Sequence, residues 1–220
     1  MENQPSEAYF QEIARQLSCP DGDQGIKTGE VMNINNIGMT KSSINALSVL
    51  DGQTILEIGH GNGGHISYLL KKAKELTYFG IDISETIITE AQRINESFIK
   101  KNQACFQLSN GESIPFEDNK FDKVFTVNTI YFWKNPAQYL AEIKRVIRRD
   151  GLFVLCFADK TFMQSLPFTK YGFTLYDEEE AISLLKIGGF RIVKSEVNKE
   201  EIQSNSGGLV TRNYHTIVCG

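Results

Sequence analysis

Long apolar runs, an excess of basic charge and paired cysteines are missing from this chain of 220 residues. No stretch approaches the ~18 uninterrupted apolar residues of a membrane-spanning helix. Lysine and arginine number 23 against 27 aspartates and glutamates, so the formal net charge is −4. A mildly acidic chain is a poor candidate for binding nucleic acid or an anionic membrane. The N-terminal segment has no apolar signal sequence, so we expect a cytoplasmic protein.

The four cysteines lie far apart and form no C-x-x-C pair; they are Cys19, Cys105, Cys156 and Cys219. We therefore expect reduced, packed thiols and no metal site, rather than a disulfide framework or a zinc centre. Hydrophobic residues make up 41% of the chain and charged residues 23%. These values are ordinary for a globular protein of this length, with one domain or one domain and an appendage.

The first 50 residues differ in character from the rest. They are polar and are interrupted by Pro20 and several glycines. Helices are predicted there near 6–18 and 40–49. We interpret residues 1–50 as a helical cap that covers a substrate, and residues 51–220 as the main domain.

From residue 53 the pattern becomes an alternation of strands and helices. Short apolar runs predict strands near 54–58, 78–81, 104–108, 121–127, 152–157, 190–197 and 213–219. Amphipathic spacing predicts helices near 64–74, 84–98, 139–147 and 177–187. This alternation is typical of an α/β fold with a mostly parallel sheet and helices on both faces. Such sheets bind ligands beyond the carboxyl ends of their strands.

A glycine-rich loop follows the first predicted strand. Gly59, Gly61 and Gly64 fit the dinucleotide-binding pattern G-x-G-x-x-G. Gly59, Gly61 and Gly63, with Glu57 two residues before the first glycine, fit a nucleoside-binding loop instead. A carboxylate at the end of a buried strand needs a partner, so Glu57 favours a ligand that carries a cation. Hydrogen bonds from the backbone N–H groups of the loop are the alternative partners of Glu57, and the two can coexist.

Polar residues also follow the next strands. Asp82 can accept hydrogen bonds from both hydroxyls of a ribose, or it can serve as a turn residue beside the predicted helix cap Ser84. Asn110 begins a loop and offers an oxygen to an exocyclic amine such as that of adenine. Asn128 ends the fourth strand, where it faces the expected ligand cleft.

Taken in order, these motifs resemble a known family. They are Glu57-x-Gly59-x-Gly61-x-Gly63, then Gly80-Ile81-Asp82-Ile83-Ser84, then Asn110-Gly111-Glu112-x-Ile114-Pro115-Phe116 with Phe121-Asp122. The set resembles the class I S-adenosylmethionine-dependent methyltransferases, especially the bacterial group that includes the ubiquinone and menaquinone biosynthesis enzymes. The resemblance covers about residues 50–157 well.

The resemblance implies a Rossmann-like sheet of seven strands in the order 3-2-1-4-5-7-6, with strand 7 antiparallel. It implies S-adenosylmethionine as cofactor and S-adenosylhomocysteine as product, with the glycine loop against the methionine part and Asp82 on the ribose. The family usually has Asp where this chain has Asn110, so one charge is lost there. The cofactor-binding residues expected are Glu57, Gly59, His60, Gly61, Gly63, Asp82, Ile83, Asn110, Gly111, Glu112 and Asn128.

The methyl acceptor is expected to be a small molecule that is partly apolar or aromatic. Two segments are predicted to cover it, residues 32–36 and the aromatic-rich residues 162–176. Three aromatic residues after the fourth strand, beginning with Tyr131, are expected to line or cover the same pocket. Tyr131 is a candidate for orienting the substrate, and none of the three histidines, His60, His65 and His215, is an evident catalytic base.

Two other functions remain open at this point. The first is a nicotinamide-dependent oxidoreductase that uses Gly59, Gly61 and Gly64. Glu57 and the fifty residues before the first strand argue against it. The second is a non-catalytic protein that keeps the fold and the cofactor pocket.

A ligand-binding measurement separates these readings of the glycine loop. We expect S-adenosylhomocysteine to raise the melting temperature and NAD to leave it unchanged. At a hundredfold excess over its dissociation constant, a ligand stabilises the folded state by about 2.7 kcal/mol. Differential scanning fluorimetry with each ligand checks this. Stabilisation by NAD alone would assign the loop to a dinucleotide.

Overall fold

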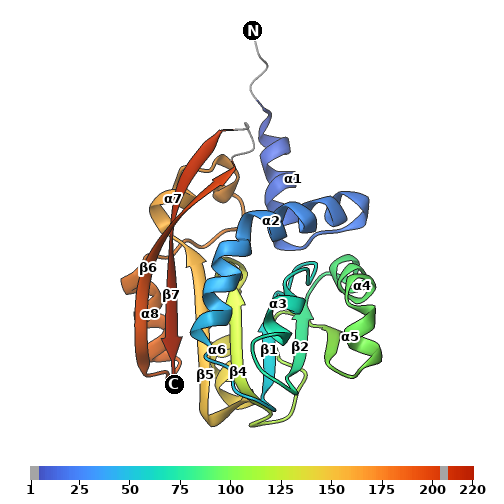
Figure 1. Cartoon of the computed structure of the whole chain (residues 1–220). Helices are drawn as coiled ribbons and strands as arrows, with labels where there is room; N and C mark the ends of the chain where they lie inside the picture. The colour runs from blue at the N-terminus through green and yellow to red at the C-terminus, as the bar shows by residue number, and fades with distance from the viewer. Residues whose placement is uncertain (1–4, 204–207) are drawn as a thin grey trace.

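The computed structural model describes residues 5–203 and 208–220 of the chain. Seven strands form one sheet in the order β3-β2-β1-β4-β5-β7-β6 (Figure 1). Their bounds are β1 Thr54–Ile58, β2 Thr77–Asp82, β3 Ala104–Leu108, β4 Phe121–Val127, β5 Ile147–Ala158, β6 Ile192–Gln203 and β7 Leu209–Cys219. Strands β1 to β5 are parallel, and β7 is antiparallel to both of its neighbours. The predicted strand order and the antiparallel strand 7 are confirmed.

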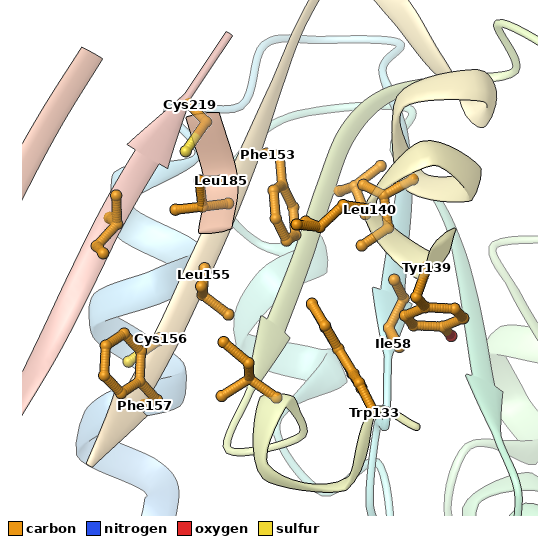
Figure 2. Close-up of a cluster of buried hydrophobic side chains, with 14 of the residues drawn as sticks. Ile58, Trp133, Tyr139, Leu140, Phe153, Leu155, Cys156, Phe157, Leu185 and Cys219 are labelled. Atoms are coloured by element: carbon orange, nitrogen blue, oxygen red, sulfur yellow. The ribbon is translucent and has the colours of Figure 1, made fainter. Parts of the chain in front are cut away.

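Helices pack on both faces of the sheet. Their bounds are α1 Glu7–Ser18, α2 Gly22–Ala46, α3 Ile66–Leu70, α4 Glu85–Ile94, α5 Glu96–Lys100, α6 Pro136–Val146, α7 Lys160–Gln164 and α8 Glu178–Ile187, with the 3₁₀ turns η1 Ile130–Phe132 and η2 Pro167–Lys170. One core cluster joins the sheet to α6 and α8 through Leu140 and Leu185 (Figure 2). A second cluster joins the other face to α3, α4 and the end of α2 through Ile66, Ile88 and Ile44.

The predicted helix cap at Ser84 is present. Its hydroxyl accepts a hydrogen bond from the backbone N–H of Ile87 at 3.1 Å, and Glu85 lies in the first turn of α4. The Ser84 hydroxyl satisfies one of the free N–H groups at the N-terminus of the helix. The negative charge of Glu85 interacts favourably with the positive end of the helix dipole. The Ser84 hydroxyl also donates to the carbonyl of Pro20, which ties the start of α4 to the segment before α2.

Helix α2 is longer than predicted. The expected helix near 40–49 begins at Gly22 instead, and it contains Gly25, Gly29 and Gly38. A glycine inside a helix costs about 1 kcal/mol relative to alanine, which is why the sequence pattern argued against a helix. Close packing explains the glycines: a Cβ at Gly29 would lie 2.7 Å from Ile87 Cδ1, and one at Gly38 would collide with the Glu200 carboxylate.

The two halves of α2 have different neighbours. In Figure 1 the first half lies with α1 beyond the carboxyl ends of the strands, and the second half runs along one face of the sheet. Met39 and Ile44 in the second half are 0% and 1% exposed, and they belong to the two core clusters. The second half of α2 therefore packs as part of the core on the sheet.

Cysteine packing differs from the expectation at one position. Cys156 and Cys219 are buried and Cys19 is half-buried, but Cys105 is exposed. Cys105 lies on β3, the edge strand of the sheet, so its side chain has a neighbouring strand on one side only. Within the described ranges, no helix has the combined length and apolar character needed to cross a membrane.

A buried arginine joins the C-terminal strands to α2. Arg212 on β7 is 5% exposed. Its guanidinium donates to Glu200 Oε1 at 2.5 Å, to the carbonyl of Asn35 at 2.7 Å and to Asn36 Oδ1 at 3.0 Å. Arginine suits this position because its planar group offers several donors in fixed directions. The contacts hold the middle of α2 against the hairpin of β6 and β7.

Replacing Arg212 is expected to destabilise the protein strongly. Arg212→Ala leaves the Glu200 carboxylate largely buried without its cation, which costs about 3 kcal/mol. The matched control is Lys194→Ala on β6, because Lys194 pairs with Glu196 at 2.7 Å on the exposed surface. An exposed pair contributes less than about 1 kcal/mol. Urea unfolding of both variants measures the difference, and equal losses would contradict this account of Arg212.

Candidate functional site

A cavity opens at the carboxyl ends of β1, β2 and β4, where the strand order reverses between β1 and β4. Its empty volume is about 1060 Å³, including the part that is open to solvent. Its walls come from the loops after β1 to β4, from one side of α2, from the end of α1 and from the start of α6. This is the position at which open α/β sheets bind their ligands.

The loop after β1 forms one wall of the cavity. Gly59 and Gly61 have φ values of 73° and 55°, in the left-handed region that favours glycine. A Cβ at Gly59 would also collide with Thr129 Cγ2. The loop therefore needs glycine at Gly59 for both its backbone conformation and its close approach to the loop after β4.

Glu57 is buried beside the glycine loop and is held by two side chains. Its Oε2 accepts hydrogen bonds from His65 Nε2 at 2.7 Å and from the Tyr78 hydroxyl at 2.6 Å. The sequence pattern predicted backbone N–H groups or a ligand as the partners of Glu57, and it gave no signal for these two side chains. Burial and the adjacent carboxylate raise the pKa of Tyr78 well above its usual value, so this hydroxyl stays protonated as a donor. Glu57 and His65 both line the cavity.

Asp82 ends β2 and also lines the cavity. One carboxylate oxygen accepts the backbone N–H of Ser84 at 3.0 Å, so its predicted turn role is present. Burial raises the pKa of Asp82, and the nearby His60 and backbone N–H groups oppose that shift. The turn role and the ligand role are therefore compatible, because the carboxylate has a second oxygen.

The side chain of His60 forms part of the cavity wall, but its ring nitrogens are hydrogen-bonded or buried. Its Nδ1 lies 2.6 Å from the carbonyl of Gly61, so Nδ1 carries the proton. Its Nε2 is buried without a hydrogen-bond partner in the described part of the chain. Burial lowers the pKa of His60, so the ring is neutral.

Three of the predicted cofactor residues lie outside the cavity wall: Gly63, Asn110 and Glu112. Asn110 is exposed, and its Oδ1 accepts the backbone N–H groups of Glu112 and Ser113, both at 2.9 Å. Its oxygen is therefore engaged by its own turn rather than presented to a ligand. Ser109 and Gly111, on either side of Asn110, line the cavity in its place. Glu112 pairs with Lys134 at 3.0 Å on the surface.

The loop after β4 forms the opposite wall. Asn128 lines the cavity and has a φ of 58°, which is uncommon for a residue with a side chain. Phe132 and Trp133 also line it, whereas Tyr131 does not. The Tyr131 hydroxyl is buried between Asn128 Oδ1 at 3.1 Å and the carbonyl of Ala158 at 3.0 Å, and burial raises its pKa. Direct contact of Tyr131 with a substrate in the cavity is therefore not favoured.

One of the two predicted covers lies on the cavity. Met32, Asn33, Asn36 and Thr40 line it from α2. Their spacing of three and four residues marks one face of a helix, a signal that was missed because no helix was predicted there. Tyr139 of α6 lies beside Trp133 (Figure 2). The sequence indicated it only as part of a helix near 139–147, and the structure shows that it lines the cavity as well.

The second predicted cover, residues 162–176, does not line the cavity. Phe173 packs against Phe132 and Tyr131, with ring centroids 4.6 and 5.9 Å apart, and does not itself line the cavity. The Tyr171 hydroxyl donates to Glu7 of α1 at 2.9 Å. This segment therefore closes the core and supports α1, because its aromatic side chains find apolar partners there.

Comparisons with known proteins agree with this geometry. Residues 56–155 match the family described as a methyltransferase domain. YrhH of Bacillus subtilis (strain 168), a putative methyltransferase, is 32% identical over 131 residues, which are 56% of this chain and 71% of that protein. The chain belongs to the class I S-adenosylmethionine-dependent methyltransferases. The nicotinamide alternative is thereby set aside.

A further relative and a solved structure extend this result. Fatty-acid O-methyltransferase of Mycolicibacterium smegmatis is 29% identical over 137 residues, which are 61% of this chain and 48% of that protein. The crystal structure of an S-adenosylmethionine-dependent methyltransferase from Aquifex aeolicus superposes with a TM-score of 0.65 at 18% identity. It covers 96% of this chain and 98% of that one. This likeness shows the shared fold.

The cavity of the methyltransferase fits S-adenosylmethionine, which carries a sulfonium and an ammonium group. Its described lining contains the carboxylates Glu57 and Asp82 and no lysine or arginine. The glycine loop and Asp82 lie on the same cavity wall. The loop of Ser109 and Gly111 lies next to Asp82 across β2 and β3 and lines the cavity there.

The role of Asp82 can be tested by measuring the affinity for S-adenosylhomocysteine and its dependence on pH. We expect Asp82→Asn to weaken S-adenosylhomocysteine binding by about 10- to 100-fold, the scale of hydrogen bonds to a charged acceptor. Because burial raises the pKa of Asp82, the carboxylate takes up its proton at a higher pH than a free carboxyl group does. The affinity of the natural protein should therefore fall as the pH is lowered from 7, and this fall should be absent in Asp82→Asn.

Isothermal titration calorimetry from pH 7 down to pH 4 measures both effects. The matched control is Asp23→Asn, because Asp23 is exposed near the start of α2. If Asp82→Asn bound as tightly as the natural protein, the carboxylate would have only its turn role.

Proposed function

We propose that this methyltransferase acts on a small molecule that is partly apolar or aromatic. The observation that carries the proposal is the composition of the cavity beyond Asp82 and the glycine loop. Phe132, Trp133, Met32 and Leu17 contribute apolar surface there, and the described lining holds no lysine or arginine. A multiply charged phosphate or a nucleic acid would lack a cationic partner in such a site.

The cofactor supplies an activated methyl group on a sulfonium sulfur. The residues of this chain contribute binding, orientation and exclusion of water. Asp82 and the glycine loop hold the cofactor, Glu57 gives the site negative charge, and α2 covers the cavity. Tyr131 positions Asn128 through a hydrogen bond at 3.1 Å. The role assigned here to each residue is part of the proposal.

The relatives support an apolar acceptor. The M. smegmatis relative is named as a fatty-acid O-methyltransferase, and others are named as methyltransferases of phthiotriol dimycocerosates. The chain spans about half or less of each of these proteins: 48% of the first and 36% of the Mycobacterium ulcerans protein. The apolar wall of the cavity is therefore the main support, and the names are consistent with it.

Substitution of two phenylalanines tests where the acceptor binds. Phe132 lines the cavity, whereas Phe168 lies on the far side of Phe173 and does not. We expect Phe132→Ala to lower kcat/KM for an apolar acceptor about tenfold or more, because it removes buried contact area worth about 1.5–3 kcal/mol. S-adenosylhomocysteine affinity should be unchanged. Phe168→Ala should keep kcat/KM per folded molecule.

The measurement is transfer of a labelled methyl group to apolar and aromatic acceptors, with binding of S-adenosylhomocysteine followed in parallel. Equal kinetics for the natural protein and Phe132→Ala would place the acceptor elsewhere. An effect of Phe168→Ala alone would restore residues 162–176 as the cover.

A further inference from the structure

Three asparagines that line the cavity have their amide orientation set by the protein. Oδ1 of Asn62 accepts the backbone N–H of Gly64 at 3.1 Å, and Oδ1 of Asn36 accepts Arg212 at 3.0 Å. Oδ1 of Asn128 accepts the backbone N–H of Ala158 at 3.0 Å and the Tyr131 hydroxyl at 3.1 Å. With each oxygen engaged, the NH₂ group of each amide is left to bind a ligand. These residues therefore act as donors toward the cavity.

The course of α2 separates these donors into two groups. Asn33 lies over the glycine loop, since a Cβ at Gly64 would be 2.9 Å from its Nδ2. Asn62 belongs to that loop and thus to the cofactor end. Farther along α2, Asn36 contacts β7 through Arg212, and Met39 contacts the end of β4 through Asn128. Asn36 and Asn128 therefore lie on the β4, β5 and β7 side of the cavity, away from Asp82 on β2.

Asn128 has an unfavourable backbone conformation that its neighbours maintain. Its backbone is in the left-handed region, with a φ of 58°, a conformation that persists only where the surroundings enforce it. Tyr131 shares its single proton between Asn128 Oδ1 and the carbonyl of Ala158. The neighbour that the structure gives Asn128 Nδ2 is Met39 Sδ at 3.5 Å, a weak acceptor. A ligand oxygen would be a much stronger partner for this donor.

Among the residues that the structure describes, none at this end of the cavity offers a side chain that can take a proton. In the described lining the carboxylate and imidazole side chains are Glu57, His60, His65 and Asp82. Glu57 and His65 hydrogen-bond each other, the free nitrogen of His60 is shielded, and Asp82 follows β2. An oxygen nucleophile beside Asn36 and Asn128 must therefore arrive already ionised. At neutral pH a carboxylate meets this requirement and an alcohol does not.

We propose that the methyl acceptor is a carboxylate on an apolar body, held by the amide NH₂ groups of Asn36 and Asn128. This rests on the proposed function of the site. One carboxylate oxygen accepts the amide donors, and a lone pair of the other forms the new O–CH₃ bond. The S–CH₃ bond breaks with its electron pair remaining on sulfur. The products are a methyl ester and the neutral thioether, and no proton is transferred.

Matched acceptors test the chemical class. The natural protein is supplied with labelled S-adenosylmethionine and with straight-chain and aryl-alkyl carboxylic acids, or with alcohols and amines of the same skeletons. Methylation of the acids alone is expected, and mild alkali should release the label as methanol because the product is an ester. Binding of each acid to the protein saturated with S-adenosylhomocysteine is measured separately by calorimetry.

Asparagine variants test the site. Asn36→Ala and Asn128→Ala should each weaken acid binding and raise KM about tenfold, while the Kd of S-adenosylhomocysteine changes less than about twofold. Tyr131→Phe should raise KM by a smaller factor, since it removes one of two hydrogen bonds that orient Asn128. Asn45→Ala is the matched control, because Asn45 is exposed at the end of the same helix.

Each remaining outcome has a definite meaning. If alcohols or amines were methylated while the acids neither bound nor reacted, the carboxylate proposal would be wrong and the proposed function would stand. If none of the acids bound to the protein, the carboxylate proposal would likewise be wrong and the proposed function would stand. If the asparagine variants weakened S-adenosylhomocysteine instead of the acids, their donors would belong to the cofactor, which also overturns the proposal. Absence of S-adenosylhomocysteine binding would overturn the proposed function itself.

Discussion

Strands β1 and β4 lie side by side, but the chain leaves them toward opposite faces of the sheet. After β1 it enters α3, which packs with one core cluster, and after β4 it enters η1 and α6, which pack with the other. Two loops that diverge from neighbouring strands leave a gap between them, and this gap is the cavity. The position of every ligand-facing residue depends on that divergence.

The polar groups around the cavity are arranged before a ligand arrives. His65 and Tyr78 hold the Glu57 carboxylate, Ser84 holds Asp82, and Tyr131 with Ala158 holds Asn128. A buried polar group without a partner is costly, so each of these contacts has a structural value of its own. They also fix the directions in which the remaining oxygen and N–H groups point. Binding then requires little rearrangement of the protein.

Sequence periodicity predicted the sheet well because buried strands leave a clear local pattern. The observed β1, β3 and β4 have the predicted bounds, and Ser84 begins α4 as its hydroxyl side chain indicated. Helix α2 could not be predicted in the same way. Its glycines Gly29 and Gly38 disfavour a helix locally, and the contacts that require them come from α4 and from Glu200, far away in the sequence.

The sequence by itself determined the class of fold, the cofactor family and the loops that form the site. Those follow from local spacing: glycines after a strand, an acid after the next strand, a cap before a helix. Tertiary structure alone decided which side chains reach the cavity. Asn110 turns into its own loop, residues 162–176 pack against α1 and the core, and Asn36 is oriented by Arg212 of β7. For residues 162–176 and for Asn36, the reason is that a side chain's direction depends on neighbours distant along the chain, which spacing does not encode. For Asn110 the partners are local, and the spacing did not show whether the side chain would serve its own turn or a ligand.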